Sequence, residues 1–266
     1  MKNLVFLCLF LIATCNFAAE IDTTKPQLLF GTEVYAPYNF VDSQTGEISG
    51  FSHDIVKALI AHVGDEVNAK IEIYPWARIY YMAQHIENVG IFSMVHSKAR
   101  DKMFKWVGVL YYPDAYIWKL RERADIQVNT KTDLKRYKTV VINDGIDYQI
   151  LTREYGLSMG DHLLAITSTE QKLLMLTSGR AELFEYGELA LRWKMHLMGL
   201  DFSLVEKVMP VPEMTSLSLA FSLKTDDAIV QKYRQALLDI KQNGTYQTIL
   251  HKWKFPAQQL RMKHPR

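Results

Sequence analysis

This chain has almost no cysteine, and it lacks both long apolar runs and basic blocks beyond its N-terminal segment. Its two cysteines, Cys8 and Cys15, both lie near the N-terminus. If that segment is removed, disulfides and thiolate sites are excluded from the rest. No later run approaches the roughly 18 apolar residues of a membrane-spanning helix. With a formal net charge of +2 and no lysine or arginine block, a nucleic-acid partner is not expected.

The motifs of common catalytic and metal sites are also missing. The chain contains no GxxxxGK[ST], HExxH, GxSxG or CxxC sequence. Its eight histidines do not have the spacing of metal ligands. These absences favour binding over catalysis. We therefore expect no enzyme activity, no cofactor and no metal, although a carboxylate general acid would need no motif.

The N-terminus has the layout of a secretory signal peptide. Lys2 precedes an apolar run over 4–13, and the small residues Ala18 and Ala19 follow it. We predict cleavage after Ala19 and a periplasmic location. The alternative is a lipoprotein signal that ends at Cys15, which we favour less because a threonine before that cysteine is unusual.

Short apolar runs alternate with helical periodicity along the remaining chain. Strands are predicted over 28–34, 70–74, 89–95, 104–110, 139–142, 163–166, 182–186 and 217–223. Helices are predicted over 54–63, 76–85, 188–198 and about 246–253, and another is predicted to begin at about 147. Two more are predicted between a capping residue and a glycine. One runs from Ser168 or Thr169 to Gly179, and the other from Asp226 or Asp227 to Gly244. This alternation predicts an α/β fold with largely parallel sheet.

Prolines interrupt the pattern in two stretches, 112–118 and 209–216, at Pro113, Pro210 and Pro212. We interpret these stretches as crossings between two lobes. Two crossings make the middle segment an insertion into a domain that is built from both ends of the chain.

Several segments resemble one known family when they are taken together and in order. They are GTEVYAPYNF (31–40), GEISGFSHDIVKAL (46–59), FSMVHSKARDKMFKWVG (92–108), TSGRAELFEYGE (177–188) and NGTYQTILHKW (243–253). The chain resembles the family 3 extracellular solute-binding proteins, the periplasmic receptors of polar amino-acid ABC importers. The stretch PWARIYYM (75–82) is similar to a divergent subgroup of that family.

The resemblance implies a two-lobe periplasmic-binding-protein fold with a two-strand hinge (type II). The first lobe would comprise 20–113 and 214–258, the second 114–213, and 259–266 would form a C-terminal tail. It also implies a monomer that closes on a small polar, carboxylate-bearing solute, an amino acid or a related compound, and delivers it to an ABC permease in the inner membrane.

The resemblance places the ligand's carboxylate at Arg100, whose planar guanidinium can donate two parallel hydrogen bonds. Ser93 and Ser97 could add donors. His96, at the end of the strand, could donate as a neutral or a charged ring. The alternative is that Arg100 is a surface residue paired with Asp101, and that His96 is an ordinary loop residue.

Two aromatic residues, Tyr35 and Trp76, match positions that enclose a ligand side chain in the family. Tyr38 and Arg78 are further candidates nearby. Glu33 follows the first strand, where open α/β sheets place ligand contacts, and could meet a ligand amine. Each of these residues could instead belong to the core or to the solvated surface.

The second lobe offers acidic candidates. Asp147 stands where the family places a hydroxyl residue at a helix N-terminus, and we favour a capping role for it over a ligand contact. Amino-acid receptors of the family carry an aspartate at the position of Gly187. Glu185 could supply that charge from two residues back. Otherwise the ligand lacks an α-ammonium group.

Two other functions remain open. Exported cyclohexadienyl dehydratases resemble these receptors, and Glu185 in a closed cleft could act as a general acid. The chain could also present its ligand to a separate membrane sensor. We prefer transport over both.

Overall fold

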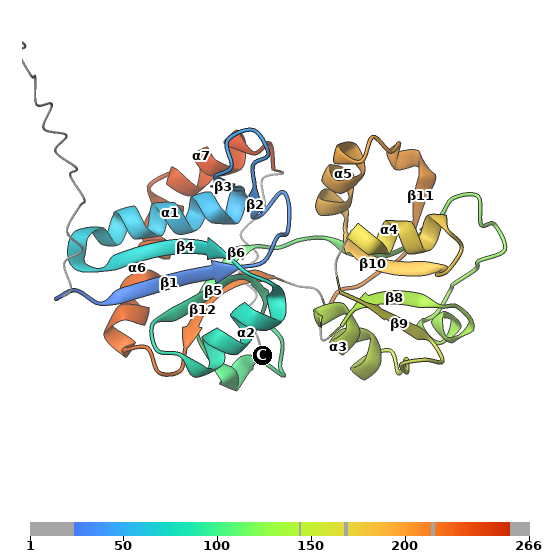
Figure 1. Cartoon of the computed structure of the whole chain (residues 1–266), viewed down its shortest axis with the longest axis horizontal. Coiled ribbons are helices and arrows are strands. Elements are labelled where there is room, and N and C mark those ends of the chain that lie inside the picture. Colours follow the sequence, from blue (N-terminus) through green and yellow to red (C-terminus); the bar gives the residue numbers. More distant parts are fainter. Residues whose placement is uncertain (1–23, 144, 168–169, 214–215, 256–266) are drawn as a thin grey trace, which may run out of the picture.

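The computed structural model describes residues 24–143, 145–167, 170–213 and 216–255. It shows two α/β lobes that lie side by side (Figure 1). The predicted signal peptide over 1–19, the tail over 259–266 and the cap at Ser168 or Thr169 lie outside the described residues. No helix in the described ranges has the length and apolar character needed to cross a membrane.

The first lobe is built around a sheet with strand order β4-β1-β5-β12-β6. Its strands are β1 (Gln27–Thr32), β4 (Asn68–Ile73), β5 (Val89–Val95), β6 (Phe104–Tyr111) and β12 (Leu217–Ser222). β1 pairs in parallel with β4 and β5, whereas β12 pairs antiparallel with β5 and β6. A short hairpin of β2 (Phe40–Val41) and β3 (Ile48–Ser49) lies beside this sheet.

The second lobe is built around a sheet with strand order β11-β7-β10-β8-β9. Its strands are β7 (Ala115–Leu120), β8 (Thr139–Ile142), β9 (Leu163–Ile166), β10 (Leu183–Gly187) and β11 (Val205–Pro210). β8 pairs in parallel with β9 and β10, and β7 pairs antiparallel with β10 and β11.

The prediction of largely parallel sheet is wrong, because both sheets are mixed. The antiparallel strands β6, β7, β11 and β12 border the two stretches where the chain passes between lobes. Their antiparallel pairs, β5–β12, β6–β12, β7–β10 and β7–β11, bring together strands that are far apart in the sequence, so no local pattern predicts them. The prolines there hid β7 and β11, which begin or end within the predicted crossings.

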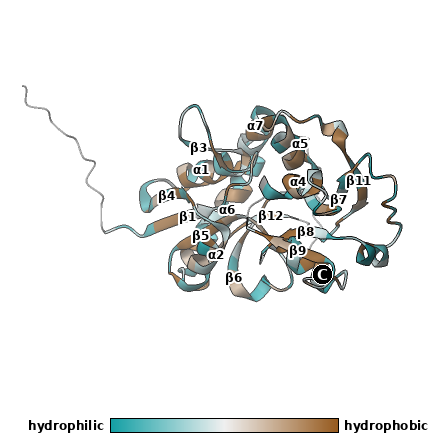
Figure 2. Cartoon of the chain, turned by 45° about the vertical axis from the view of Figure 1, so that its right-hand side comes forward, coloured by the Kyte–Doolittle hydropathy of each residue, from teal (hydrophilic) through white to brown (hydrophobic). Residues whose placement is uncertain are grey.

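Helices cover both faces of the first sheet. They are α1 (Phe51–Val63), α2 (Trp76–His85), α6 (Asp227–Gln242) and α7 (Thr245–Lys252). α1 buries Ile55, Val56 and Leu59 at helical spacing in the main core, which also contains α6 and α7. α2 packs on the opposite face, where Ile79 and Ala83 belong to a separate apolar cluster. Figure 2 shows the apolar strands lying inside this arrangement.

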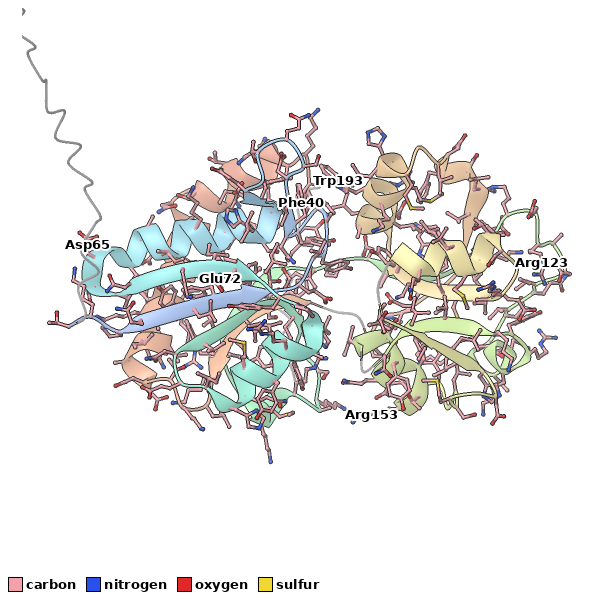
Figure 3. The ribbon with its side chains drawn as sticks, in the orientation of Figure 1. Phe40, Asp65, Glu72, Arg123, Arg153 and Trp193 are labelled. Atoms are coloured by element: carbon pink, nitrogen blue, oxygen red, sulfur yellow. The ribbon has the colours of Figure 1, made fainter. Side chains whose placement is uncertain are left out.

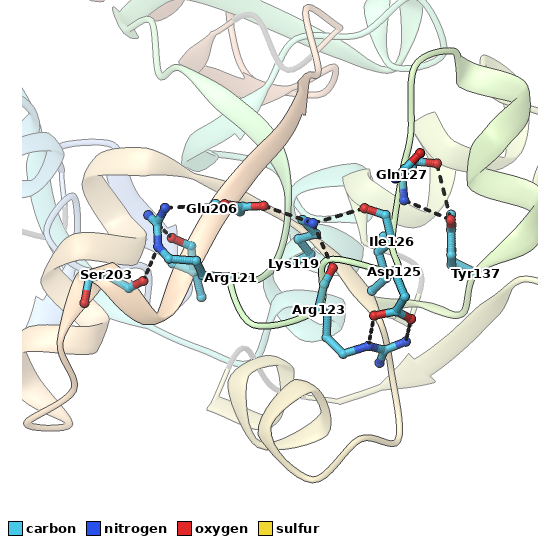
Figure 4. Close-up of polar contacts among 10 residues, drawn as sticks. Lys119, Arg121, Arg123, Asp125, Ile126, Gln127, Tyr137, Ser203 and Glu206 are labelled. Atoms are coloured by element: carbon cyan, nitrogen blue, oxygen red, sulfur yellow. Dashed lines mark hydrogen bonds and ion pairs between the residues drawn. The ribbon is translucent and has the colours of Figure 1, made fainter.

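The helices of the second lobe are α3 (Ile146–Arg153), α4 (Glu170–Thr177) and α5 (Glu188–Leu197). A buried lysine on β7, Lys119, holds the loop that follows this strand (Figure 4). Its ammonium donates to the carbonyls of Arg123 (2.8 Å) and Ile126 (3.0 Å) and lies 2.9 Å from the Glu206 carboxylate. All three partners belong to the second lobe and lie outside the cleft described below.

Most predicted elements are confirmed within a few residues of their ends. Val89–Val95, Thr139–Ile142 and Leu163–Ile166 form strands over the predicted ranges. Asp226 is confirmed as the cap of α6, because its carboxylate accepts a hydrogen bond from the Ala228 N–H at 2.7 Å.

Candidate ligand-binding cleft

A cavity of about 80 Å³, partly open to solvent, lies where residues of the two lobes face each other. Its first-lobe wall consists of Glu33, Tyr35, Trp76, Ser93, Val95, Arg100 and Leu217. Its second-lobe wall consists of Ile142, Gly145, Ile146, Asp147, Lys172, Glu185 and Tyr186. Many of these residues follow the carboxyl ends of parallel strands, which is where open α/β sheets place their ligand contacts.

Arg100 is a buried cation on the first-lobe wall, with 1% of its surface exposed. It does not pair with Asp101, since that carboxylate is held by His96. The Arg100 Nη1 donates to the carbonyl of Val95 at 3.2 Å, whereas the buried Nε and Nη2 have no hydrogen-bond partner. Burial lowers the pKa of this guanidinium. Arg100 thus has two buried donors that no described residue uses.

Aromatic rings stabilise the charge of Arg100. Its guanidinium carbon lies 5.1 Å from the ring centroids of both Trp76 and Tyr80. The two rings stack on one another, 5.3 Å apart, along the first turns of α2. Trp76 therefore lines the cleft and also contacts Arg100.

Tyr35 connects the two walls. Its ring lies 5.0 Å from that of Tyr38, which is fully buried in the first lobe, and 6.1 Å from that of Tyr186 in the second. Burial raises the pKa of the Tyr35 phenol well above its usual value. Glu33, two residues earlier, lines the same wall, and its charge favours the charged form of Arg100.

Ser93 reaches the cleft through a distortion of β5. Its φ of 57° is left-handed, which is uncommon for a residue other than glycine. The pairing of β5 with β12 shifts register at the same point, between Ser218 and Ala220. The Ser93 hydroxyl donates to the side-chain oxygen of Asn39. The bulge explains how a residue inside a strand turns toward the ligand space.

The structure places His96, Ser97 and Arg78 outside the residues that line the cleft. His96 stacks on Trp106 with ring centroids 3.9 Å apart, and its Nε2 lies 2.8 Å from Asp101. The carbonyl of Ser97 accepts the Arg100 N–H within the turn. Arg78 is exposed and lies over the ring of Tyr74. The turn after β5 thus sends Arg100 inward and His96 toward β6.

Asp147 is buried on the second-lobe wall, and the prediction that it caps the helix is wrong. The cap of α3 is Gly145, and no side chain makes a capping hydrogen bond there. The Asp147 carboxylate instead accepts the N–H groups of Ile142 and Tyr148, both at 2.9 Å. It also accepts a hydrogen bond from Lys172 at 2.8 Å.

Lys172 is the charged residue of the cleft that sequence reasoning missed. It lies on α4, is 3% exposed, and donates both to Asp147 and to the backbone carbonyl of Glu185, the latter at 3.0 Å. A signal was present, because helical spacing places Lys172 on the same buried face as Leu173 and Leu176. A lysine on the apolar face of a helix needs a partner in the interior.

Glu185 completes a carboxylate–lysine cluster with Asp147 and Lys172. One of its oxygens, Oε2, lies 3.9 Å from the Lys172 ammonium, and the other, Oε1, is buried without a partner. Burial raises the pKa of Glu185 to about 7; Lys172 opposes that shift and Asp147 adds to it. Gly187, the position where the resemblance predicts an aspartate, packs against Tyr35, and a Cβ there would lie 3.3 Å from the tyrosine hydroxyl.

Among the described residues, no group of three histidine, cysteine, aspartate or glutamate side chains could hold a metal ion. The chemistry of the cleft is that of hydrogen bonding and charge. A guanidinium with unused donors lines one wall, a carboxylate with an unused oxygen lines the other, and aromatic side chains line both.

Two α/β lobes with a polar, ring-lined cleft between them define a two-lobe solute-binding fold. Residues 28–257 match the model of the bacterial extracellular solute-binding proteins, family 3. The chain belongs to this family, and its general function is solute binding.

Named relatives of the chain are distant but cover nearly its full length. A probable amino-acid ABC transporter-binding protein of Haemophilus influenzae is 24% identical, over 95% of this chain and 97% of the relative. An arginine-binding periplasmic protein of Mannheimia haemolytica is 25% identical, over 91% and 97%. The fold matches that of an ancestral arginine-binding protein solved with arginine, with a TM-score of 0.72, 20% identity, and coverage of 86% of this chain and 98% of that one.

Proposed function

We propose that this protein is the periplasmic receptor of an ABC importer and that it closes on a small solute whose carboxylate binds Arg100. The observation that supports this most directly is the pair of buried, unpartnered donors on Arg100, a residue that lines the cleft. A buried donor without a partner costs about 1–3 kcal/mol, and more when the group is charged. A bidentate carboxylate would remove that cost, and it has the geometry that a guanidinium prefers.

The relatives support the transport part of the proposal. One is described as an amino-acid ABC transporter-binding protein and another as arginine-binding. We therefore propose a monomeric receptor, exported by the signal over 1–19, that delivers its solute to an inner-membrane permease and catalyses no reaction. Its lobes would comprise 20–113 with 214–258, and 114–213, with closure by rotation about the two connecting segments.

The test is a binding screen with the full chain. Thermal denaturation is followed against small carboxylates, amino acids and polyamines, and the affinity of each hit is measured by calorimetry. We expect carboxylates to raise the melting temperature. Arg100→Gln should weaken their binding by about 100-fold, since a charge-assisted bidentate contact is lost in a desolvated site.

Arg78→Gln is the matched control. Arg78 lies near the cleft but is exposed and does not line it, so its loss should change the affinity by less than about threefold. The proposal fails if the best ligand has no carboxylate. It also fails if Arg100→Gln binds that ligand as tightly as the wild type does.

A further inference from the structure

The cleft contains three buried side-chain atoms without hydrogen-bond partners among its described residues. Two are the donors Nε and Nη2 of Arg100, and the third is the acceptor Oε1 of Glu185. They belong to opposite walls. A ligand that satisfies all of them presents an acceptor group to the first lobe and a single donor to the second.

An ammonium group is already present on the second-lobe wall. The Lys172 ammonium lies 2.8 Å from Asp147 Oδ2, 3.0 Å from the Glu185 carbonyl and 3.9 Å from Glu185 Oε2. Like its two carboxylate neighbours, it is almost completely buried. The protein thus supplies from its own chain the cation that these acidic groups require.

A ligand amine would fit this wall poorly. A protonated amine has three N–H donors, whereas Asp147 is already occupied by Lys172 and two backbone N–H groups. Only one unpartnered side-chain oxygen, Glu185 Oε1, remains among the buried atoms of the described cleft. A second ammonium near Lys172 would also be repelled by it in a medium of low dielectric constant.

We infer that Lys172 takes the place of a ligand amine, and that the cleft selects a small carboxylate whose second polar group is a hydroxyl rather than an ammonium. A 2-hydroxy acid has this pattern. The inference rests on the proposed function, because it takes the Arg100–carboxylate contact as given. It adds that the second polar group of the ligand, the hydroxyl, hydrogen-bonds to Glu185.

A hydroxyl also suits both protonation states of Glu185. Because burial raises the pKa of this carboxyl group, both forms are present near neutral pH. An ionised Glu185 accepts the hydroxyl proton in a hydrogen bond, and a protonated one donates to the hydroxyl oxygen. An ammonium group can only donate, so it would bind much more tightly to the ionised form than to the protonated one, where the charge attraction is lost.

The first experiment compares matched ligands with the wild-type chain. Each 2-hydroxy acid is titrated beside the amino acid that has the same side chain, at neutral pH. We expect the tightest hydroxy acid to bind at least tenfold more tightly than its amino partner. If carboxylates bind but the amino partner is equal or better, this inference is overturned while the proposed function stands. If no carboxylate of either series binds, the proposed function fails, and the inference fails with it.

The second experiment exchanges the cation. In Lys172→Met, Asp147 and Glu185 lose the ammonium group that the lysine supplies. A ligand amine should then bind in place of that ammonium. The ratio of the two affinities, hydroxy acid over amino acid, should therefore shift toward the amino acid by at least tenfold. Lys119→Met is the matched control, because Lys119 is a buried lysine of the same lobe whose partners lie outside the cleft. It should lower stability but leave the preference unchanged. An unchanged preference in a folded Lys172→Met, or an equal shift in both variants, overturns the inference. The wild-type titrations decide the question if Lys172→Met does not fold.

Discussion

Each wall of the cleft contains a buried cation, and the two walls differ in how many partners the protein itself provides for that cation. On the first-lobe wall, the Arg100 guanidinium has one carbonyl and two aromatic rings as neighbours, and two of its nitrogens have no partner. On the second-lobe wall, Lys172 lies against two carboxylates and a carbonyl. The first-lobe wall therefore has unsatisfied hydrogen-bond donors in the absence of a ligand, whereas the cation of the second-lobe wall already has its partners within the protein.

This difference separates stability from binding. A buried ion whose partners are present stabilises the fold only while the pair is intact, and removing one member is costly. A buried ion that lacks a partner costs stability in the empty protein and returns it when the ligand arrives. Substitutions on the two walls should therefore have opposite effects on the ligand-free protein.

The largest expected effect is that of Asp147→Asn. It leaves Lys172 buried with only Glu185 as an acidic neighbour, so the ligand-free protein should lose about 4 kcal/mol of unfolding free energy. Denaturant titration measures the loss. Glu206→Gln is the control, because Lys119 keeps two carbonyl acceptors and Glu206 is partly exposed, so about 1 kcal/mol is expected. Equal losses of unfolding free energy in the two variants would show that the buried Lys172–Asp147 pair stabilises the fold no more than the partly exposed Lys119–Glu206 pair does.

The next effect concerns pH and Glu185. Its pKa is raised by burial from a usual value near 4.5 to about 7 in the folded state. The folded protein therefore binds this proton more tightly than the unfolded chain does, so its contribution to stability is complete below about pH 4.5 and is lost as pH rises through 7. Between these limits, the wild type should lose about 3 kcal/mol relative to Glu185→Gln. If the unfolding free energies of the two proteins change in parallel between pH 4.5 and 7, folding does not raise the pKa of Glu185. Lys172 would then keep Glu185 ionised over this pH range.

Much of the fold could be predicted because its signals are local. The strand over Val89–Val95 is a continuous apolar run, and α6 combines a capping aspartate with a helical apolar face. Arg100 could be placed in the cleft from its position in a family segment. The boundaries of the lobes stay a prediction, although the strands of the two sheets fall on either side of them.

What could not be predicted depends on long-range pairing. Whether Lys172 reaches Asp147 is decided by how α4 packs against β8 and β10, which no local pattern contains. The bulge that turns Ser93 toward the cleft arises from its pairing with β12, a strand more than a hundred residues away in the chain. His96 lies in the same family segment as Arg100, yet its ring stacks on Trp106 and lies outside the cleft lining.

A smaller effect, opposite in sign to that of Asp147→Asn, is expected for Arg100→Gln in the absence of ligand. The substitution removes a buried charge whose donors lack partners, so the unfolding free energy should rise by about 1–2 kcal/mol. Arg78→Gln, at an exposed position, should change it by less than about 0.5 kcal/mol. A loss of stability on Arg100→Gln would mean that the first-lobe wall is already complete without a ligand.

The smallest effect tests how the two walls are brought together. Phe40 and Trp253 of the first lobe and Trp193 on α5 of the second form an interlobe ring cluster, with centroid distances of 5.8–6.3 Å. Figure 3 shows Phe40 and Trp193 facing each other across the two lobes. None of the three lines the cleft. Their contact should therefore favour the closed form without touching the ligand.

Trp193→Ala should weaken ligand binding by about five- to tenfold, because each aromatic contact is worth about 0.5–1.5 kcal/mol and the closed form becomes less populated. Calorimetry gives the affinity, and small-angle scattering of the ligand-free protein should show a larger radius of gyration. Leu197→Ala, on the same helix but 66% exposed, should change neither quantity. If Trp193→Ala binds as the wild type does, the walls meet through the ligand alone, and the charges on the two walls are then sufficient to close the cleft.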